Sequence, residues 1–192
     1  MVNKQRGRDM FFRARLLIIT LLIFLPGQGH ATISGMNLMG KGEIYYMGFI
    51  KVYDAALYAN NQSGGQTVMD SETSRCLKLT YNVSLAVKDF VLGAETVLAR
   101  QHSPEEIAKL RKEIDMLHRA YRDVRKGDIY YLCYDAQQRL TTLTLNDTEL
   151  VSVTSAEFAE AYFGIWLGAV QPIDEKLRDR LLRGPEKNLA AQ

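Results

Sequence analysis

Aromatic side chains are the residues of this sequence best suited to hold or transform a small molecule. They gather in two segments: Tyr45, Tyr46, Phe49, Tyr53 and Tyr58 in the first, and Phe158, Tyr162, Phe163 and Trp166 in the second. Such rings pack into a core, which is the simpler interpretation, or they line a cleft for an apolar ligand. The periodicity of the sequence fits both. A pair of tyrosine hydroxyls could also serve as acid and base.

The motifs of the common enzyme chemistries are missing. The sequence has no Gly-x-Ser-x-Gly elbow, phosphate loop, His-Glu-x-x-His pair or dinucleotide fingerprint. We expect His102 and His118 at the surface, because histidines on the polar side of a helix rarely make sites. With Cys76 and Cys133 they offer no recognisable metal-ligand spacing. No metal and no cofactor are therefore expected.

The two cysteines each lie in a segment that reads as a strand, CLKLTY and IYYLCY. A disulfide would need their Cα atoms within about 7 Å. Cysteine is among the most buried residue types. Buried free thiols are the favoured interpretation, and a disulfide is the alternative.

The first 31 residues have the order of a secretion signal. Basic residues from Lys4 to Arg15 precede an apolar run from Leu16 to Leu25, and small residues lead to Ala31. A helix needs roughly 20 apolar residues to cross a bilayer, about twice this run, so no permanent membrane span is expected. We expect cleavage near Ala31, which leaves residues 32–192 as one periplasmic or secreted domain.

Net charge argues against a nucleic-acid partner. Removing residues 1–31 removes five basic side chains and one acidic one, which changes the formal net charge from +2 to about −2. Binding to phosphates requires clustered lysine and arginine. No such cluster remains.

The patterns along the rest of the chain predict strands and helices in groups. Strands are expected at 42–48, 49–59, 76–83, 129–135, 139–145 and 149–153, and helices at 84–100, 103–121, 155–167 and 174–182. The helix at 103–121 is the most strongly patterned: Ser103 and Glu106 form a capping box, and an apolar stripe follows. Strands followed by helices, twice over, predict an α+β fold with an antiparallel sheet covered on one side.

Three segments carry a resemblance to a known family. GKGEIYYMGFIKVYDAALYA, RDVRKGDIYYLCYD and FAEAYFGIWLGAVQPIDEKLRDRLL occur in the order in which bacterial chalcone-isomerase-like proteins have similar segments. They span Gly40 to Leu182, nearly the whole expected domain. The resemblance implies the chalcone-isomerase fold: a large antiparallel sheet, helices over one face, and an apolar cleft between them.

The resemblance does not extend to the catalytic residues. Chalcone isomerases steady an oxyanion with an arginine in the first strand, where this chain has Glu43, Ile44 and Tyr45 and only Lys41 nearby. The other matching positions also differ: Tyr53, Glu106, Glu113, Ile165 and Trp166. Acidic groups would raise the energy of an oxyanion. Flavonoid isomerisation is therefore not expected.

We expect a non-catalytic protein that binds an apolar small molecule or fatty acid in the cleft. The resemblance implies this, since the fold includes fatty-acid-binding members that hold the carboxylate with an arginine and a tyrosine. Here only Lys41 or Lys51 could supply the charge. The expected ligand-binding residues are Tyr45, Tyr53, Tyr162 and Trp166. The alternatives are an isomerase or intramolecular lyase with a diverged site, and an envelope factor that uses the fold to bind an unknown protein partner.

Overall fold

The computed structural model describes residues 33, 35–60 and 68–183, so the expected signal segment at 1–31 lies outside the described residues. One antiparallel sheet contains the strands in chain order. They are β1 (Asn37–Tyr46), β2 (Ile50–Ala59), β3 (Arg75–Tyr81), β4 (Ile129–Asp135), β5 (Leu140–Leu145) and β6 (Thr148–Thr154). The helices are α1 (Val87–Gln101), α2 (Pro104–Lys109), α3 (Arg111–Ala120), α4 (Ala156–Leu167) and α5 (Glu175–Leu182).

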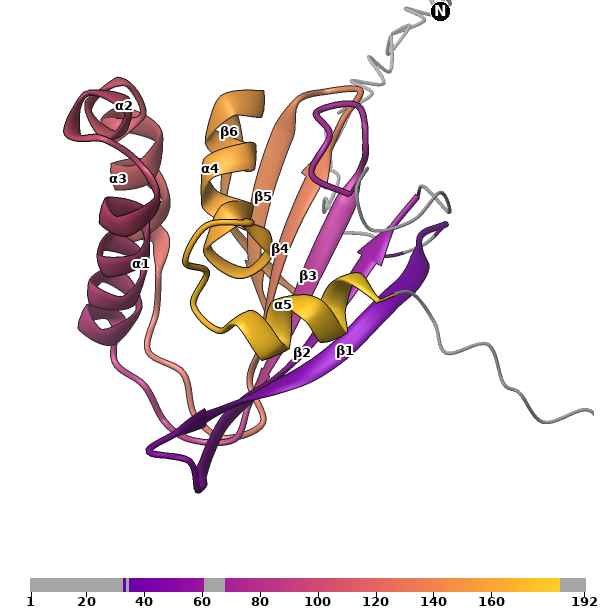
Figure 1. The fold of residues 1–192 in the computed structure, drawn as a ribbon, viewed down its shortest axis with the longest axis vertical. Helices are drawn as coiled ribbons and strands as arrows, with labels where there is room; N and C mark the ends of the chain where they lie inside the picture. The colour runs from indigo at the N-terminus through magenta and orange to yellow at the C-terminus, as the bar shows by residue number, and fades with distance from the viewer. Residues whose placement is uncertain (1–32, 34, 61–67, 184–192) are drawn as a thin grey trace, which may run out of the picture.

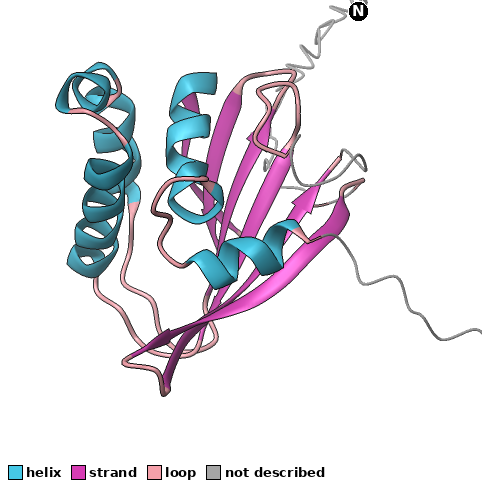
Figure 2. Ribbon diagram, in the orientation of Figure 1, coloured by secondary structure: helices cyan, strands magenta, loops and turns pink. Residues whose placement is uncertain are grey.

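The helices cover one face of this sheet (Figures 1 and 2). Alternate residues of a strand point to opposite faces. In β3, Leu77, Leu79 and Tyr81 face the helices and are buried, whereas Lys78 and Thr80 face away and are half-buried. The predicted α+β fold, with an antiparallel sheet covered on one side, is confirmed.

Helix α4 is the central helix of the covering layer. The Ser155 hydroxyl caps it by accepting the amide hydrogen of Phe158 at 3.0 Å. From Phe158 to Leu167 every residue except Glu160 is buried. A helix that is apolar on all sides is suited to the interior, and α4 lies between the sheet and α1.

Helix α5 explains the pair of glycines at the start of β1. It crosses the helix-facing side of β1, and its backbone reaches the strand at Gly40. A Cβ atom on Gly40 would overlap the carbonyl oxygens of Arg180 and Leu181, and one on Gly42 would overlap the Leu177 side chain. The Gly-x-Gly spacing therefore permits close packing of α5 on the sheet.

The predicted helix at 103–121 is two helices. The Ser103 and Glu106 capping box forms as expected, but the chain turns at Leu110, whose amide bonds to the Ile107 carbonyl in a tighter turn. Ile114 and Leu117 are buried in α3, whereas Ile107 and Leu110 are half-buried. The break changes the direction of the helix, so the apolar residues before and after Leu110 are buried to different extents.

Among the described helices, none is both long and apolar enough to cross a bilayer.

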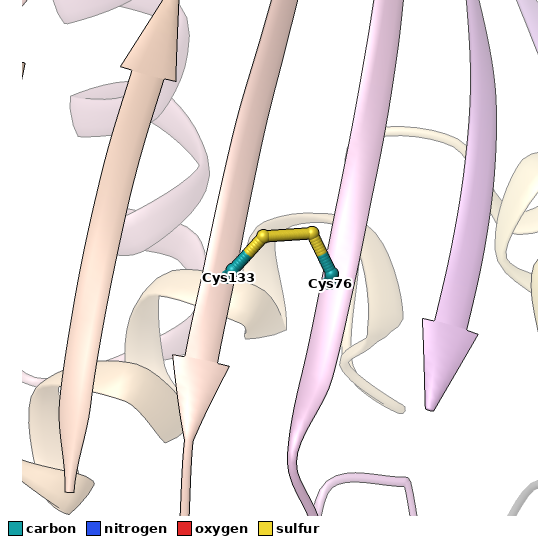
Figure 3. Close-up of a disulfide and its surroundings, with 2 residues drawn as sticks. All are labelled: Cys76 and Cys133. Carbon is teal, nitrogen blue, oxygen red and sulfur yellow. A yellow bond between two sulfur atoms is a disulfide. The ribbon is translucent and has the colours of Figure 1, made fainter. Parts of the chain in front are cut away.

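The expectation of free thiols is wrong. Cys76 and Cys133 occupy directly opposed positions of β3 and β4, with Cα atoms 4.0 Å apart, and form a disulfide (Figure 3). Both point to the sheet face away from the helices, because their neighbours Leu77 and Leu132 point toward the helices. The sequence did not reveal this pairing because register is a property of the assembled sheet.

Two glycine substitutions test the contact between α5 and β1. Gly40→Ala should lower the free energy of unfolding by about 1–3 kcal/mol or more, because backbone atoms must move to admit the methyl group. Gly93→Ala in α1 is the matched control: a Cβ there meets nothing within 4 Å, so stability should stay level or rise by up to about 1 kcal/mol. Urea unfolding would measure both. Equal stability of the Gly40 variant and the wild type would contradict the close packing.

Candidate functional site: an apolar cavity

A cavity of about 750 Å³ lies between the sheet and helices α1 and α4. Side chains from β1 to β5 form its sheet side, including Val52, Leu79, Leu132 and Leu143. Volumes of roughly 300–1,000 Å³ with mostly apolar walls are typical of small-molecule sites. The predicted cleft between sheet and helices is thus present as a cavity in the structure.

Small residues on α1 leave this space open. Phe90, Gly93, Ala94 and Val97 follow one another at helical spacing, so they share the face of α1 that looks toward the sheet. Gly93 and Ala94 line the cavity, and a Cβ at Gly93 would meet no atom within 4 Å. Large side chains at these positions would fill the volume. Gly93 and Ala94 are the residues from which the cavity could have been predicted in the sequence. The periodicity of the apolar residues does not distinguish a cavity from a filled core.

Tyrosine rings form the polar part of the lining, and most of their hydroxyls bond to protein groups. Trp166 Nε1 donates to the Tyr53 hydroxyl at 3.0 Å. The hydroxyls of Tyr121 and Tyr162 lie 2.8 Å apart and share a hydrogen bond. The Tyr130 hydroxyl donates to the Arg122 carbonyl at 2.9 Å and accepts from the Arg122 amide at 2.8 Å. These bonds hold the rings in place around the cavity.

Tyr81 differs from the other buried tyrosines of the lining. It lies directly opposite Tyr53 in the β2–β3 pair, and their ring centroids are 5.6 Å apart. Within the described part of the chain, its hydroxyl makes no hydrogen bond. Burial raises the pKa of both Tyr53 and Tyr81 above the ordinary value for tyrosine, so both rings stay protonated. Sequence reasoning did not single out Tyr81.

The cavity opens beside the hairpin that joins β1 to β2. Tyr46 and Leu92 line the cavity and are 61% and 69% exposed, so they mark its mouth. Asp89 also lies at the mouth, where its carboxylate accepts the Ala86 amide at 2.9 Å and caps α1. Met47 and Phe49 extend the exposed apolar surface of the hairpin tip.

The structure separates the four predicted ligand-binding residues. Tyr53 and Trp166 both line the cavity. Tyr162 lies behind the wall and reaches it only through its bond to Tyr121. Tyr45 does not line the cavity: it is 47% exposed, and its hydroxyl donates to Glu43 Oε2 at 2.9 Å. Strand alternation explains this, because its neighbours Ile44 and Tyr46 are the residues that face the cavity.

Neither lysine considered as a partner for a carboxylate lines the cavity. Lys41 is exposed and lies with Lys51 on the part of the sheet away from the helices. Lys51 Nζ binds Glu43 Oε1 at 2.8 Å and also pairs with Asp54. Among the described residues that line the cavity, Asp89 alone carries a charge.

Arg75 is a buried arginine outside the cavity wall. Its guanidinium lies over the rings of Tyr134 and Phe163, at 4.7 and 4.8 Å from the centroids. Its Nη1 donates to the carbonyl oxygens of Val68, Asp70 and Thr73. Burial lowers the pKa of Arg75 to about 10. Its contacts hold the chain that leads into β3.

The prediction that both histidines lie at the surface is wrong for His118. His118 is 8% exposed and packs against the rings of Tyr121 and Tyr162, while His102 is half-buried. The Nδ1 atom of His118 lies 3.3 Å from Glu95 Oε1, and burial lowers the pKa of the His118 imidazole. Glu95 of α1 and Tyr162 of α4 lie against the imidazole, so these two helices cover this side chain. Within residues 33, 35–60 and 68–183, no group of three or more His, Cys, Asp or Glu side chains could hold a metal ion.

Comparison with known proteins assigns the family. The model of the family described as chalcone isomerase-like matches residues 25–183, most of the chain. The chain belongs to the chalcone isomerase-like family. No curated protein matches the sequence closely enough to add to this.

A solved structure agrees with the family at the level of the fold. The crystal structure of a fatty-acid binding protein from Arabidopsis thaliana superposes with a TM-score of 0.60 and 15% sequence identity. The match covers 78% of this chain and 87% of the plant protein. At this identity the likeness shows that the two chains share a fold.

Proposed function

We propose that this protein binds an apolar, fatty-acyl-like molecule in the cavity without transforming it. The observation that carries the proposal is the cavity of about 750 Å³, walled by apolar and aromatic side chains and open beside Tyr46 and Leu92. Burial of apolar ligand surface stabilises such a complex by roughly 25 cal/mol per Å² before the costs of association. The plant protein of the same fold, which is described as fatty-acid binding, supports this ligand class.

Two observations favour binding over catalysis. A ring closure of the chalcone type develops negative charge on oxygen, which needs a positive or strongly donating group aimed at it. Within the part of the chain that the structure describes, no lysine, arginine or histidine lines the cavity. An acid–base pair of tyrosines works best with pKa values near the working pH, yet burial moves the pKa of Tyr53 and Tyr81 upward, away from it.

The alternative of a protein-binding surface receives less support. An interaction factor that uses only the outside of the fold would have a filled interior, whereas this interior contains a cavity. In the described part of the chain, the exposed large apolar side chains are Tyr45, Tyr46, Met47, Phe49, Ile50, Leu92 and Val170. Tyr46, Ile50 and Leu92 line the cavity. Tyr45, Met47 and Phe49 belong to the hairpin that joins β1 to β2. Their position suits the entry of an apolar ligand.

We also propose that the protein acts in the periplasm or outside the cell. The signal-like segment at 1–31 motivates this, and the disulfide between Cys76 and Cys133 supports it, since disulfides persist in oxidising compartments. Mass spectrometry of protein isolated from the cell envelope should show a chain that begins near residue 32 with this disulfide formed. An intact Met1 terminus on the isolated protein would sink the export proposal.

The single tryptophan offers a direct test of ligand binding. Trp166 lines the cavity, so 2-undecanone, a ketone with an eleven-carbon chain, should change its fluorescence with saturation. Substitutions at Gly93 should weaken the interaction in order of size, Ala, then Leu, then Phe. Gly93→Leu should reduce affinity roughly tenfold, because its side chain enters the same volume.

Thr96→Leu is the matched control, since Thr96 is exposed on the same helix. Circular dichroism should show that all the variants fold. Saturable binding that is indifferent to Gly93→Phe would place the ligand elsewhere. Emission that is indifferent to the ketone, to undecanoate and to undecane alike would contradict the proposed function.

A further inference from the structure

Two neighbouring hydroxyls in the cavity have hydrogens that no described protein group accepts. Trp166 donates to the oxygen of Tyr53, which leaves the hydroxyl hydrogen of Tyr53 free to donate. Tyr81 makes no hydrogen bond through its hydroxyl among the described residues. The two residues are opposite partners in β2 and β3, with ring centroids 5.6 Å apart, and both line the cavity, so they present two donors to one region of it.

The other tyrosines of the interior are paired differently. The Tyr130 hydroxyl is satisfied by the backbone of Arg122. Tyr121 and Tyr162 share one hydrogen bond, which uses one of their two hydroxyl hydrogens. Tyr46 lies at the exposed mouth. Among the described residues, Tyr53 and Tyr81 are thus the neighbouring pair in which both hydroxyls keep a hydrogen to donate.

The charges around the cavity disfavour an anion at these donors. A carboxylate removed from water without a cation is strongly destabilised. No cationic side chain of residues 33, 35–60 and 68–183 lines the cavity, and Asp89 places a negative charge at its mouth. Arg75 is held by three carbonyl oxygens outside the wall, and Lys51 pairs with Glu43 on the other side of the sheet.

Building on the proposed function, we propose that Tyr53 and Tyr81 form a subsite for the oxygen of an uncharged carbonyl group. The ligand class is then a neutral long-chain carbonyl compound, such as a ketone or ester, and not a fatty-acid anion. The two hydroxyls donate to the carbonyl oxygen while the hydrocarbon chain lies against the apolar walls. Trp166 acts as a positioning residue, because its bond to Tyr53 orients that hydroxyl.

Three ligands of equal chain length test this inference on the full folded chain at pH 7.5: 2-undecanone, undecanoate and undecane. Calorimetry, with undecane as a competitor of the ketone, gives each affinity. The ketone should bind about tenfold or more tightly than the carboxylate, because the latter is ionised at this pH. Tyr81→Phe should weaken ketone binding about 2- to 12-fold, the value of one hydrogen bond, and leave undecane unchanged.

Tyr81→Phe is the cleaner variant, since it removes no hydrogen bond of the described protein, whereas Tyr53→Phe also removes the partner of Trp166. Tyr45→Phe is the control: it removes a hydroxyl that lies outside the cavity and should change none of the three affinities. Undecanoate binding more tightly than the ketone would overturn the inference and leave the proposed function intact. Equal ketone affinity in the wild type, Tyr53→Phe and Tyr81→Phe would also overturn the inference and leave the proposed function intact. Failure of all three ligands to bind would remove the proposed function as well.

Discussion

The hydrogen bond between Trp166 and Tyr53 is the interaction on which the site depends. It joins helix α4 to strand β2: Trp166 Nε1 lies 3.0 Å from the Tyr53 hydroxyl oxygen, and both side chains are buried. An unsatisfied indole or phenol in the interior would cost more than such a bond contributes, so the two rings are held together. A second bond, between Tyr121 and Tyr162, ties the end of α3 to α4. With both bonds made, the rings are fixed as parts of a wall and cannot turn inward to fill the cavity.

The small residues of α1 complete this arrangement. Close packing normally eliminates voids because every missing contact loses dispersion energy. Here Gly93 and Ala94 occupy positions from which larger side chains would reach the sheet. The ring side chains described above are held by their hydrogen bonds, so they do not move in to fill the space. At the other edge, Gly40 and Gly42 let α5 approach β1 closely. Glycine therefore permits the close packing of α5 on β1 and, in α1, leaves the space of the cavity unfilled.

Much of the fold could be predicted from the sequence, because it is written in local patterns. The strand at CLKLTY, the capping box of Ser103 and Glu106, and the order of strands and helices all match the structure. What could not be predicted depends on contacts between distant segments. The disulfide depends on the register of β3 against β4, and the burial of His118 depends on the packing of α3 against α1 and α4. The position of Tyr45 depends on which face of β1 lies toward the cavity. Tyr81 was missed because a tyrosine in an alternating strand looks like any core residue until its hydroxyl is found without a partner.

The central claim is that the cavity between the sheet and helices α1 and α4 is a ligand site. Native mass spectrometry of the protein purified gently from its own host tests this most directly. The account predicts a folded species that carries one additional mass of a small apolar molecule, which organic extraction removes and which Gly93→Phe fails to retain. A wild-type spectrum in which the chain alone accounts for every charge state, unchanged after incubation with apolar ligands, would contradict it.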